Sequence, residues 1–412
     1  MEEQEKNKTI KTFAIASFLN DMGSDIIYPI WPLFVTQILG ANMAILGLLD
    51  GLGEALVSIS QAVSGYLSDR LKKRKIFIWI GYFMGGLSRI GYGLSTTYIH
   101  LIPFKILDRA GKIRSAPRDA IVADYSNREN RGRNFGLLRT ADHLGALVGI
   151  IICISLFKVL GYRNLFLLAA IPSIIGATLI ISKIKEPKTS ETKIFKGIKL
   201  SDFNKNFQLF LILSAFFALG SFSYSFLLIY AKEFGFNITF VPVLYLIFTV
   251  FASLFSLPFG KLADKIGRKK VLLLSYLLWG LMCLNFLYLV YGYPQILANF
   301  IIKTFNLGGI HLYNDIIKVM LTFAGIITAF ILYGLHKAAL DPVQKTLVSE
   351  LAPADFRASA LGGFQMVIGL CALPSSLVAG ILWDKIGLMA PLLLSLALTL
   401  IALTMLTFIK DN

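Results

Sequence analysis

The sequence predicts an all-α integral membrane protein with twelve transmembrane helices, arranged as two similar six-helix bundles. Three observations support this prediction. The chain is 56% hydrophobic and 16% charged, with a mean hydropathy of +0.70; its apolar segments alternate with clusters of charge; and one basic motif occurs twice. A composition this apolar does not supply enough polar surface for a water-soluble domain.

Twelve apolar segments, each bounded by charged or turn-forming residues, predict the individual spans. A helix that crosses a bilayer needs about 20 mostly apolar residues. Because lipid offers no hydrogen-bond partner to an exposed backbone group, each segment is expected to be helical. The segments lie at 12–39, 43–68, 76–95, 98–123, 134–157, 164–182, 207–231, 238–260, 271–291, 318–347, 360–383 and 388–409.

The distribution of Lys and Arg predicts the orientation, because basic loops resist translocation across the membrane. If the N-terminus is cytoplasmic, the inner loops and tails hold most of the 40 basic residues and the outer loops hold few. We therefore expect a multi-pass protein of the cell membrane, in contact with the lipid bilayer, with both termini in the cytoplasm. The same bias accounts for most of the net charge of +16, so we expect no nucleic-acid partner.

A basic motif occurs after the second and again after the eighth predicted span. The sequence GYLSDRLKKRK at 65–75 recurs as GKLADKIGRKK at 260–270. A weaker pair follows the fourth and tenth spans, namely RGRNFG at 131–136 and RASALG at 357–362. Matching motifs at matching positions indicate two six-helix halves that arose by duplication.

The repeat sets the expected domain boundaries. We predict an N-terminal bundle at 1–182, a hydrophilic cytoplasmic linker at 183–206 and a C-terminal bundle at 207–412. The two motifs are further apart in the second half, which places an extracellular insertion near 291–317. Its apolar residues are spaced like one face of a helix lying in the membrane interface, and a disordered loop is the alternative.

The duplicated motif resembles the signature loop of the major facilitator superfamily, G-x-L-[AS]-D-[RK]-x-G-[RK]-[RK]-[RK]. The resemblance covers essentially the whole chain. It implies a solute transporter that works by alternating access. Two further motifs, NDMGSDIIYP at 20–29 and RAGKIRSAPRDA at 109–120, resemble a largely uncharacterised prokaryotic branch of that superfamily. One departure is Lys72, where the family usually has Gly, and we expect it to alter the tight turn.

The resemblance also implies a conformational latch. In it Asp69 and Asp264 hold the two halves in one state and release them during transport, with Arg131 and Arg357 as ionic partners. The alternative is that both carboxylates cap solvated helix ends. The latch residues implied in this way are Gly65, Asp69, Arg70, Arg131, Gly260, Asp264, Arg268 and Arg357.

Charged residues inside the spans are concentrated in the first half. Such charges cost about 2.5 to 3.5 kcal/mol each to insert, so they usually face a cavity or a partner. The first half is therefore the expected place of solute binding or ion coupling. Its candidates are Asp21, Asp25, Glu54, Arg89, Lys105, Asp108, Arg109, Lys112 and Asp142.

Two interpretations of these charges remain open. In one, the bases Arg89, Lys105, Arg109 and Lys112 line a cavity and bind an anionic solute such as a carboxylate or a phosphate ester. In the other, the bases neutralise the acids in structural pairs and leave an apolar cavity for lipophilic compounds, as in a drug-efflux transporter. The sequence favours the first by a small margin.

The fourth span is the richest in charge. A spacing of three or four residues places Lys105, Asp108 and Lys112 on one helix face, where Asp108 and Lys112 are four residues apart and able to pair. Pro117 removes a backbone donor and is expected to bend this span.

Asp21 and Glu54 lie near mid-span in adjacent helices, so they are the candidates for binding a coupling proton. Structural packing pairs are the alternative. In the second half Tyr224 and Tyr333 belong to helices that line the cavity in the family, so they are candidates for solute contact. We expect a monomer whose partners are a small, anionic solute and a coupling proton.

Other classes of protein are disfavoured. No phosphate-binding loop, nucleophile elbow or metal-ligand cluster occurs, so we predict no enzyme, cofactor or metal. Cys153, Cys283 and Cys371 lie far apart in apolar segments, unlike a disulfide framework. A membrane receptor or scaffold without transport remains a less favoured alternative, because a static protein gains little from two latch loops and many intramembrane charges.

Overall fold

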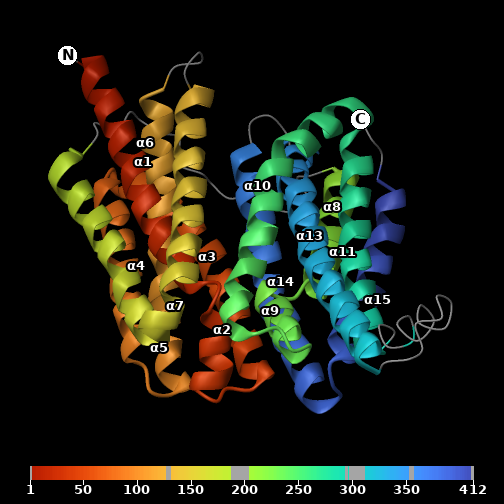
Figure 1. Ribbon diagram of the computed structural model, residues 1–412. Coiled ribbons are helices and arrows are strands. Elements are labelled where there is room, and N and C mark those ends of the chain that lie inside the picture. Colours follow the sequence, from red (N-terminus) through yellow and green to blue (C-terminus); the bar gives the residue numbers. More distant parts are fainter. Residues whose placement is uncertain are drawn as a thin grey trace. The chain divides into compact units, whose positions relative to one another are not determined.

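In a computed structural model of the protein, the described residues are 2–126, 131–186, 204–292, 296, 311–351 and 357–409. Every regular element in these ranges is a helix (Figure 1). The chain divides into two compact units, Met1–Ala41 with Leu49–Ile198 and Asn42–Leu48 with Lys199–Asn412.

The first six predicted spans correspond to a series of helices with several breaks. These are α1 (Glu2–Ile27), α2 (Trp31–Leu33), the π-helix η1 (Phe34–Ile38), α3 (Met43–Leu71), α4 (Lys75–Leu94), α5 (Tyr98–Ala110), the 3₁₀-helix η2 (Gly111–Arg114), α6 (Ser115–Asp124) and α7 (Arg131–Lys183). The helix α7 contains two spans, because Gly161 interrupts it with φ of 65° and ψ of −173°.

The last six predicted spans are more regular. They correspond to α8 (Lys205–Gly220), α9 (Tyr224–Glu233), η4 (Ile238–Phe240), α10 (Val241–Ile266), α11 (Arg268–Val290), α13 (His311–Leu351), α14 (Arg357–Lys385) and α15 (Met389–Thr407). Eight helices among the described residues are long and apolar enough to cross a bilayer, and α7 is counted once in that number. The other spans, α1, α4 and α5 with α6, carry charge, and the prediction of twelve spans is confirmed.

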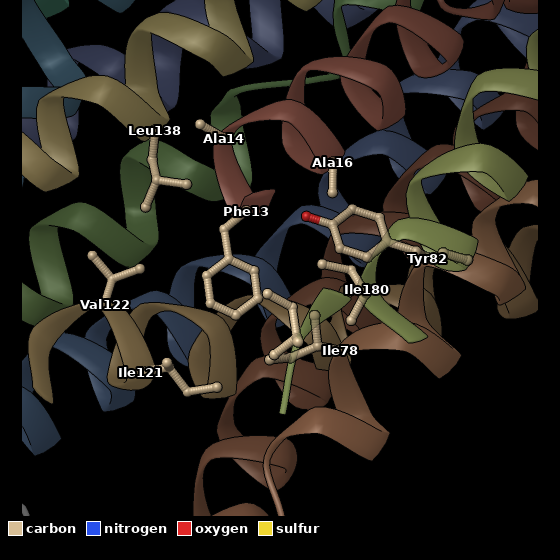
Figure 2. Close-up of a cluster of buried hydrophobic side chains, with 11 residues drawn as sticks. Phe13, Ala14, Ala16, Ile78, Tyr82, Ile121, Val122, Leu138 and Ile180 are labelled. Carbon is tan, nitrogen blue, oxygen red and sulfur yellow. The ribbon is translucent and has the colours of Figure 1, made fainter. Parts of the chain in front are cut away.

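The core of the first unit is formed by side chains from α1, α4, α6 and α7. Figure 2 shows the ring of Phe13 among these side chains, which include Ile78, Ile121 and Ile180. All four are essentially inaccessible to solvent. This cluster holds α1 against α4 and α7, the helices whose polar side chains are described below.

The second unit is held together by aromatic side chains. Phe217 of α8 stacks on Tyr276 of α11 with ring centroids 3.9 Å apart. Trp279 of α11 donates a hydrogen bond of 2.8 Å to Ser395 of α15. Apolar rings with few polar partners distinguish this unit from the first, as the uneven distribution of charge in the sequence predicts.

The turns after α3 and after α10 share a left-handed backbone position. Lys72 has φ of 53° and is the only non-glycine with positive φ among the described residues. Gly267, at the equivalent position of the second motif, has φ of 98°. Lysine therefore occupies a conformation that favours glycine, so the tight turn itself is retained at a cost in backbone strain.

Two predicted segments fall mainly outside the described residues. The structure does not describe residues 187–203 of the linker or residues 297–310 of the insertion. The interfacial helix expected in the insertion therefore stays a prediction. The last part of the insertion belongs to α13, which already begins at His311.

Candidate functional site

A buried ion pair joins α3 to α5 in the first unit. Lys105 Nζ lies 3.2 Å from Asp50 Oδ1, which also accepts a hydrogen bond of 3.0 Å from Trp31 Nε1. The same ammonium lies 4.1 Å from the centroid of the Trp31 ring. The side chains of Lys105 and Asp50 are 3% and 7% exposed. The charge of Lys105 is thus neutralised inside the bundle.

Arg89 of α4 is a buried guanidinium surrounded by neutral acceptors. It donates to the backbone oxygens of Ala169 (3.0 Å) and Asn20 (3.1 Å), to Ser24 Oγ (2.7 Å) and to Ser173 Oγ. Its side chain is 2% exposed. Arg89 therefore joins α4 to α1 and α7, and these acceptors occupy its Nη1 and Nη2 groups.

Two further bases are paired near the ends of their helices. Arg118 of α6 binds Asp119 at 2.8 Å and donates a hydrogen bond of 2.5 Å to Ser17 of α1. Arg139 of α7 lies 3.3 Å from Asp142. The second pair is incomplete, because Oδ1 of Asp142 is buried without a hydrogen bond.

The fourth span changes from α-helix to 3₁₀-helix near its middle. The helix α5 ends at Ala110, η2 covers Gly111–Arg114, and α6 starts at Ser115. The break lies against α4: a Cβ on Gly81 would be 2.4 Å from the Gly111 oxygen, and one on Gly111 would be 2.7 Å from the Gly81 oxygen. A short 3₁₀ stretch within a helix often marks a hinge.

This break corrects two expectations about the fourth span. Pro117 lies in the first turn of α6, where a missing backbone donor costs little, and the change of helix type precedes it. Asp108 pairs with Arg109, with Nε and Oδ2 3.6 Å apart, instead of with Lys112. The tighter turn that begins at Gly111 rotates Lys112 away from its α-helical position.

Of the four candidate bases Arg89, Lys105, Arg109 and Lys112, the last two are the least satisfied by hydrogen-bond acceptors among the described residues. Arg109 donates a bond of 3.3 Å to Tyr28 Oη, but its buried Nε has no acceptor within hydrogen-bond distance. Lys112 is partly buried and has no ion pair or hydrogen bond with the described residues. Arg109 comes directly before the break in the fourth span and Lys112 lies within it. Apart from the ion pair of Arg109 Nε with Asp108 at 3.6 Å, both keep donors for a further acceptor.

Three acids lie near these two bases. Asp21 of α1 is partly buried, accepts a bond of 3.0 Å from Asn20, and interacts electrostatically with Lys112. Asp142 interacts with both Asp21 and Lys112. Glu54 of α3 is exposed and interacts electrostatically with Arg109. A fourth predicted candidate, Asp25, is buried at 8% exposure.

Tyr28 and Gly53 complete this group, and the sequence analysis did not identify either as a site residue. The Tyr28 ring centroid lies 5.2 Å from the Arg109 guanidinium carbon. A Cβ on Gly53 would be 3.2 Å from Arg109 Nε and 3.0 Å from Lys105 Cε. The motif at 20–29, which contains Tyr28, was the available signal, whereas nothing in the sequence marked Gly53.

The two basic loops make similar ion pairs. Arg74 Nη1 lies 2.5 Å from Asp124 Oδ2, at the end of α6. Arg268 lies 3.1 Å from Glu350, at the end of α13. Each loop therefore binds the acid that ends the fourth span of its own half. The predicted latch partners were Arg131 and Arg357, whose side chains lie outside the described set, as does that of Asp69.

The remaining latch residues are placed as follows. Asp264 lies 2.7 Å from Arg268, one turn further along the chain. Arg70 is exposed. A Cβ on Gly65 would be 3.5 Å from Ala116, whereas one on Gly260 would meet nothing within 4 Å. Glycine is therefore not required at either position by close packing within the described structure.

A lysine near the end of each basic motif also binds the end of the sixth span of its half. Lys75 Nζ donates a bond of 2.8 Å to the Ile181 oxygen, and Lys269 Nζ donates bonds of 2.9 and 2.7 Å to the Thr407 and Ile409 oxygens. These contacts satisfy carbonyls that lack a partner at a helix C-terminus.

The N-terminal segment is tied to the same end of the first unit. Lys185 donates a hydrogen bond of 2.9 Å to Glu5, and this bond lowers the pKa of the Glu5 carboxyl. Both groups are exposed, so the pair contributes little to stability in water.

The two tyrosines predicted in the second unit belong to an aromatic cluster. Tyr224 of α9 packs against Tyr245 with centroids 5.3 Å apart, and Tyr333 of α13 packs against Phe248 at 5.1 Å. Tyr333 is 6% exposed, whereas Tyr224 is partly exposed. Of the two, Tyr224 is therefore the more accessible.

The sequence as a whole matches a known family. The model for the Major Facilitator Superfamily matches residues 13–223 and 208–412, so each half matches separately. The chain belongs to the Major Facilitator Superfamily. It is therefore a multi-pass membrane protein of a transporter family, and the resemblance inferred from the duplicated loops is confirmed.

Individual relatives agree with this assignment. An uncharacterized MFS-type transporter of Methanocaldococcus jannaschii is 34% identical over 390 residues, which cover 92% of this chain and 90% of the relative. The crystal structure of the nucleoside transporter NupG matches with a TM-score of 0.70 at 16% identity, over 97% of both chains. A peptide transporter POT in complex with sulfate matches with a TM-score of 0.73 at 15% identity, over 98% of this chain and 95% of that chain. At these identities the two solved structures establish the fold alone.

Proposed function

We propose that this protein is a secondary transporter that moves a small solute bearing an anionic group, and that Arg109 and Lys112 bind this group. The observation that supports this proposal is the unused donor capacity of these two bases at the break in the fourth span. A carboxylate or phosphate accepts hydrogen bonds in the geometry that a guanidinium and an ammonium offer.

The other predicted bases are poor candidates for the anion. Lys105 is occupied by Asp50 and by the Trp31 ring, and Arg89 is surrounded by acceptors from α1 and α7. An anion that bound to either would have to displace buried partners, which costs free energy. We therefore assign Lys105 and Arg89 to structural pairing. We assign Arg109 and Lys112 to anion binding.

We further propose that the two carboxylates beside Lys112 couple transport to a proton. Asp21 and Asp142 interact electrostatically with each other and with Lys112. A proton on this pair removes negative charge next to Lys112, which strengthens the attraction of its ammonium for an anion. Proton and solute are then bound together. Of the two acids that the sequence suggested for the coupling proton, Asp21 is partly buried and Glu54 is exposed, so we assign this role to Asp21 with Asp142.

Alternating access is assigned to the duplicated loops. Gly65, Asp69, Arg70 and Arg131 in the first half, and their counterparts in the second, form the latch. The pairs of Arg74 with Asp124 and of Arg268 with Glu350 keep each loop attached to its own half. The positive-inside bias supports an orientation with both ends in the cytoplasm, and we propose that the protein acts as a monomer in the cell membrane.

Flux in proteoliposomes tests this function. Purified protein is reconstituted and uptake of a panel of small carboxylates and phosphate esters is measured with and without an imposed pH gradient. We expect uptake that the gradient accelerates, and loss of that acceleration in the double variant Asp21→Asn/Asp142→Asn. Asp341→Asn, which removes an exposed acid paired with Lys337, is the control. Uptake of lipophilic cations alone would instead support drug efflux.

A further inference from the structure

Glu54 is a carboxylate without a partner, placed beside the proposed anion site. It lies on α3, is exposed, and forms no hydrogen bond or ion pair through its side chain with the described residues. The preceding residue, Gly53, approaches Arg109 so closely that a Cβ there would be 3.2 Å from Arg109 Nε. Glu54 and Arg109 are near enough to interact electrostatically.

The depth of Glu54 within α3 makes its exposure informative. The helix covers Met43–Leu71, so Glu54 is close to its middle and more than two turns from either end. A charged carboxylate at this depth is costly in contact with lipid, so its exposed face must meet water or a ligand. An exposed carboxylate beside Arg109 is therefore open to a solute that binds there.

A solute with only negative charge fits this arrangement poorly. Its anionic group would be attracted by Arg109 and Lys112 but repelled by Glu54. Asp50 and Asp108 do not present this problem in the same way, because each has a basic partner within 4 Å. Glu54 is therefore available to a positive charge, which no described side chain supplies by direct contact.

We propose that the transported solute is a zwitterion, whose ammonium group binds Glu54 while its carboxylate or phosphate binds Arg109 and Lys112. This proposal rests on the proposed anion site and adds the second charge. The solute class is a small molecule that carries one acidic group and one protonated or quaternary amine. Separate contacts for each charge give selectivity over molecules that carry only one of them.

Matched pairs of ligands that differ only in the amine test this proposal. The probes are 4-aminobutyrate with butyrate, glycine with acetate, and phosphoethanolamine with ethyl phosphate, together with butylamine and inorganic phosphate. Binding to the purified full-length chain is measured as ligand-dependent thermal stabilisation. We expect at least one zwitterion to bind about tenfold more tightly than its amine-free partner, and butylamine to bind weakly.

The variant Glu54→Gln separates this inference from the proposed function. It should weaken zwitterion binding about tenfold and strengthen phosphate binding severalfold, because the repelling charge is gone. Glu54→Asp keeps the charge and should retain the preference for zwitterions. Arg109→Gln should weaken both classes. The melting temperature without ligand reports whether each variant is folded.

Each outcome decides between the two proposals. If amine-free anions bind as tightly as zwitterions and Glu54→Gln changes neither class, the zwitterion inference is wrong and the anion site stands. If no anion or zwitterion stabilises the protein, both proposals are wrong. If zwitterions bind but Glu54→Gln leaves their affinity unchanged, another group binds the amine and the inference about Glu54 is wrong.

Discussion

Arg74 donates a hydrogen bond of 2.5 Å to Asp124, and so joins the loop after α3 to the end of α6. The Arg74 side chain is 3% exposed, and that of Asp124 is 44% exposed. A similar pair in the second half, Arg268 with Glu350, is 22% and 45% exposed, although Arg268 aligns with Lys73 and not with Arg74. The duplicated motif therefore produced the same type of ion pair twice, and the arginine is more deeply buried in the first half than in the second.

Removing the Arg74 pair should destabilise the first half measurably. We expect Asp124→Asn to cost about 2 kcal/mol, because it leaves a buried guanidinium without its charged acceptor. Glu350→Gln should cost less than about 1 kcal/mol, since that pair is more accessible to water. Thermal unfolding in one detergent compares the two variants. Equal losses of stability would show that burial of the arginine is not the deciding factor.

Replacing Lys72 by glycine should stabilise the protein. Lys72 has φ of 53°, a conformation that costs a non-glycine residue about 1 kcal/mol. We expect Lys72→Gly to raise the melting temperature and Gly267→Lys to lower it. Lys73→Gly, at the adjacent position, is the control and should not raise it. A lower melting temperature for Lys72→Gly would indicate that the lysine side chain makes a contact worth more than the strain.

Gly81 and Gly111 should tolerate no side chain. A methyl group on either would overlap a carbonyl oxygen across the α4–η2 contact, at 2.4 and 2.7 Å. We expect Gly81→Ala and Gly111→Ala to cost about 1 to 3 kcal/mol and to slow transport, because the break in the fourth span must shift. Gly363→Ala is the control, since a Cβ there meets nothing within 4 Å and the substitution favours the helix. Normal stability of Gly111→Ala would mean that α4 moves apart from η2 easily.

The pair of Lys105 and Asp50 should behave as a structural unit. Either Lys105→Met or Asp50→Asn leaves one buried charge unpaired, which costs about 3 to 5 kcal/mol. The double variant removes both charges and should recover most of that loss. Solute affinity of the double variant, measured on the folded fraction, should stay within about threefold of the original. A double variant that folds but no longer binds solute would show that the Lys105–Asp50 pair is needed for solute binding.

The fold was predictable from the sequence because hydropathy and charge are local properties. The twelve spans, the duplicated loops and the unusual position of Lys72 all follow from the order of residues along the chain. The partners of charged side chains did not follow, because they depend on how each helix is rotated against its neighbours. Asp108, for example, has the spacing to pair with Lys112 but pairs with Arg109, since the 3₁₀ turn at Gly111 changes the rotation.

The sequence predicted which charged residues belong to the candidate site, but not the role of each one. Sequence analysis identified nine charged residues of the first half without separating solute contacts from structural pairs. The distinction required hydrogen-bond partners: Lys105 and Arg89 have buried acceptors, whereas Lys112 has none among the described residues. Gly53 carries no chemical group, so only its close approach to Arg109 reveals its role.

Binding of small anions to purified protein with and without the two proposed contacts tests the account most directly. We predict that carboxylates, phosphates or their zwitterionic relatives raise the melting temperature, and that Arg109→Gln or Lys112→Gln weakens this binding at least about tenfold. Lys158→Gln, a change at an exposed lysine, should leave it unchanged. Stabilisation by lipophilic cations alone, or anion binding that survives loss of both Arg109 and Lys112, would contradict the account.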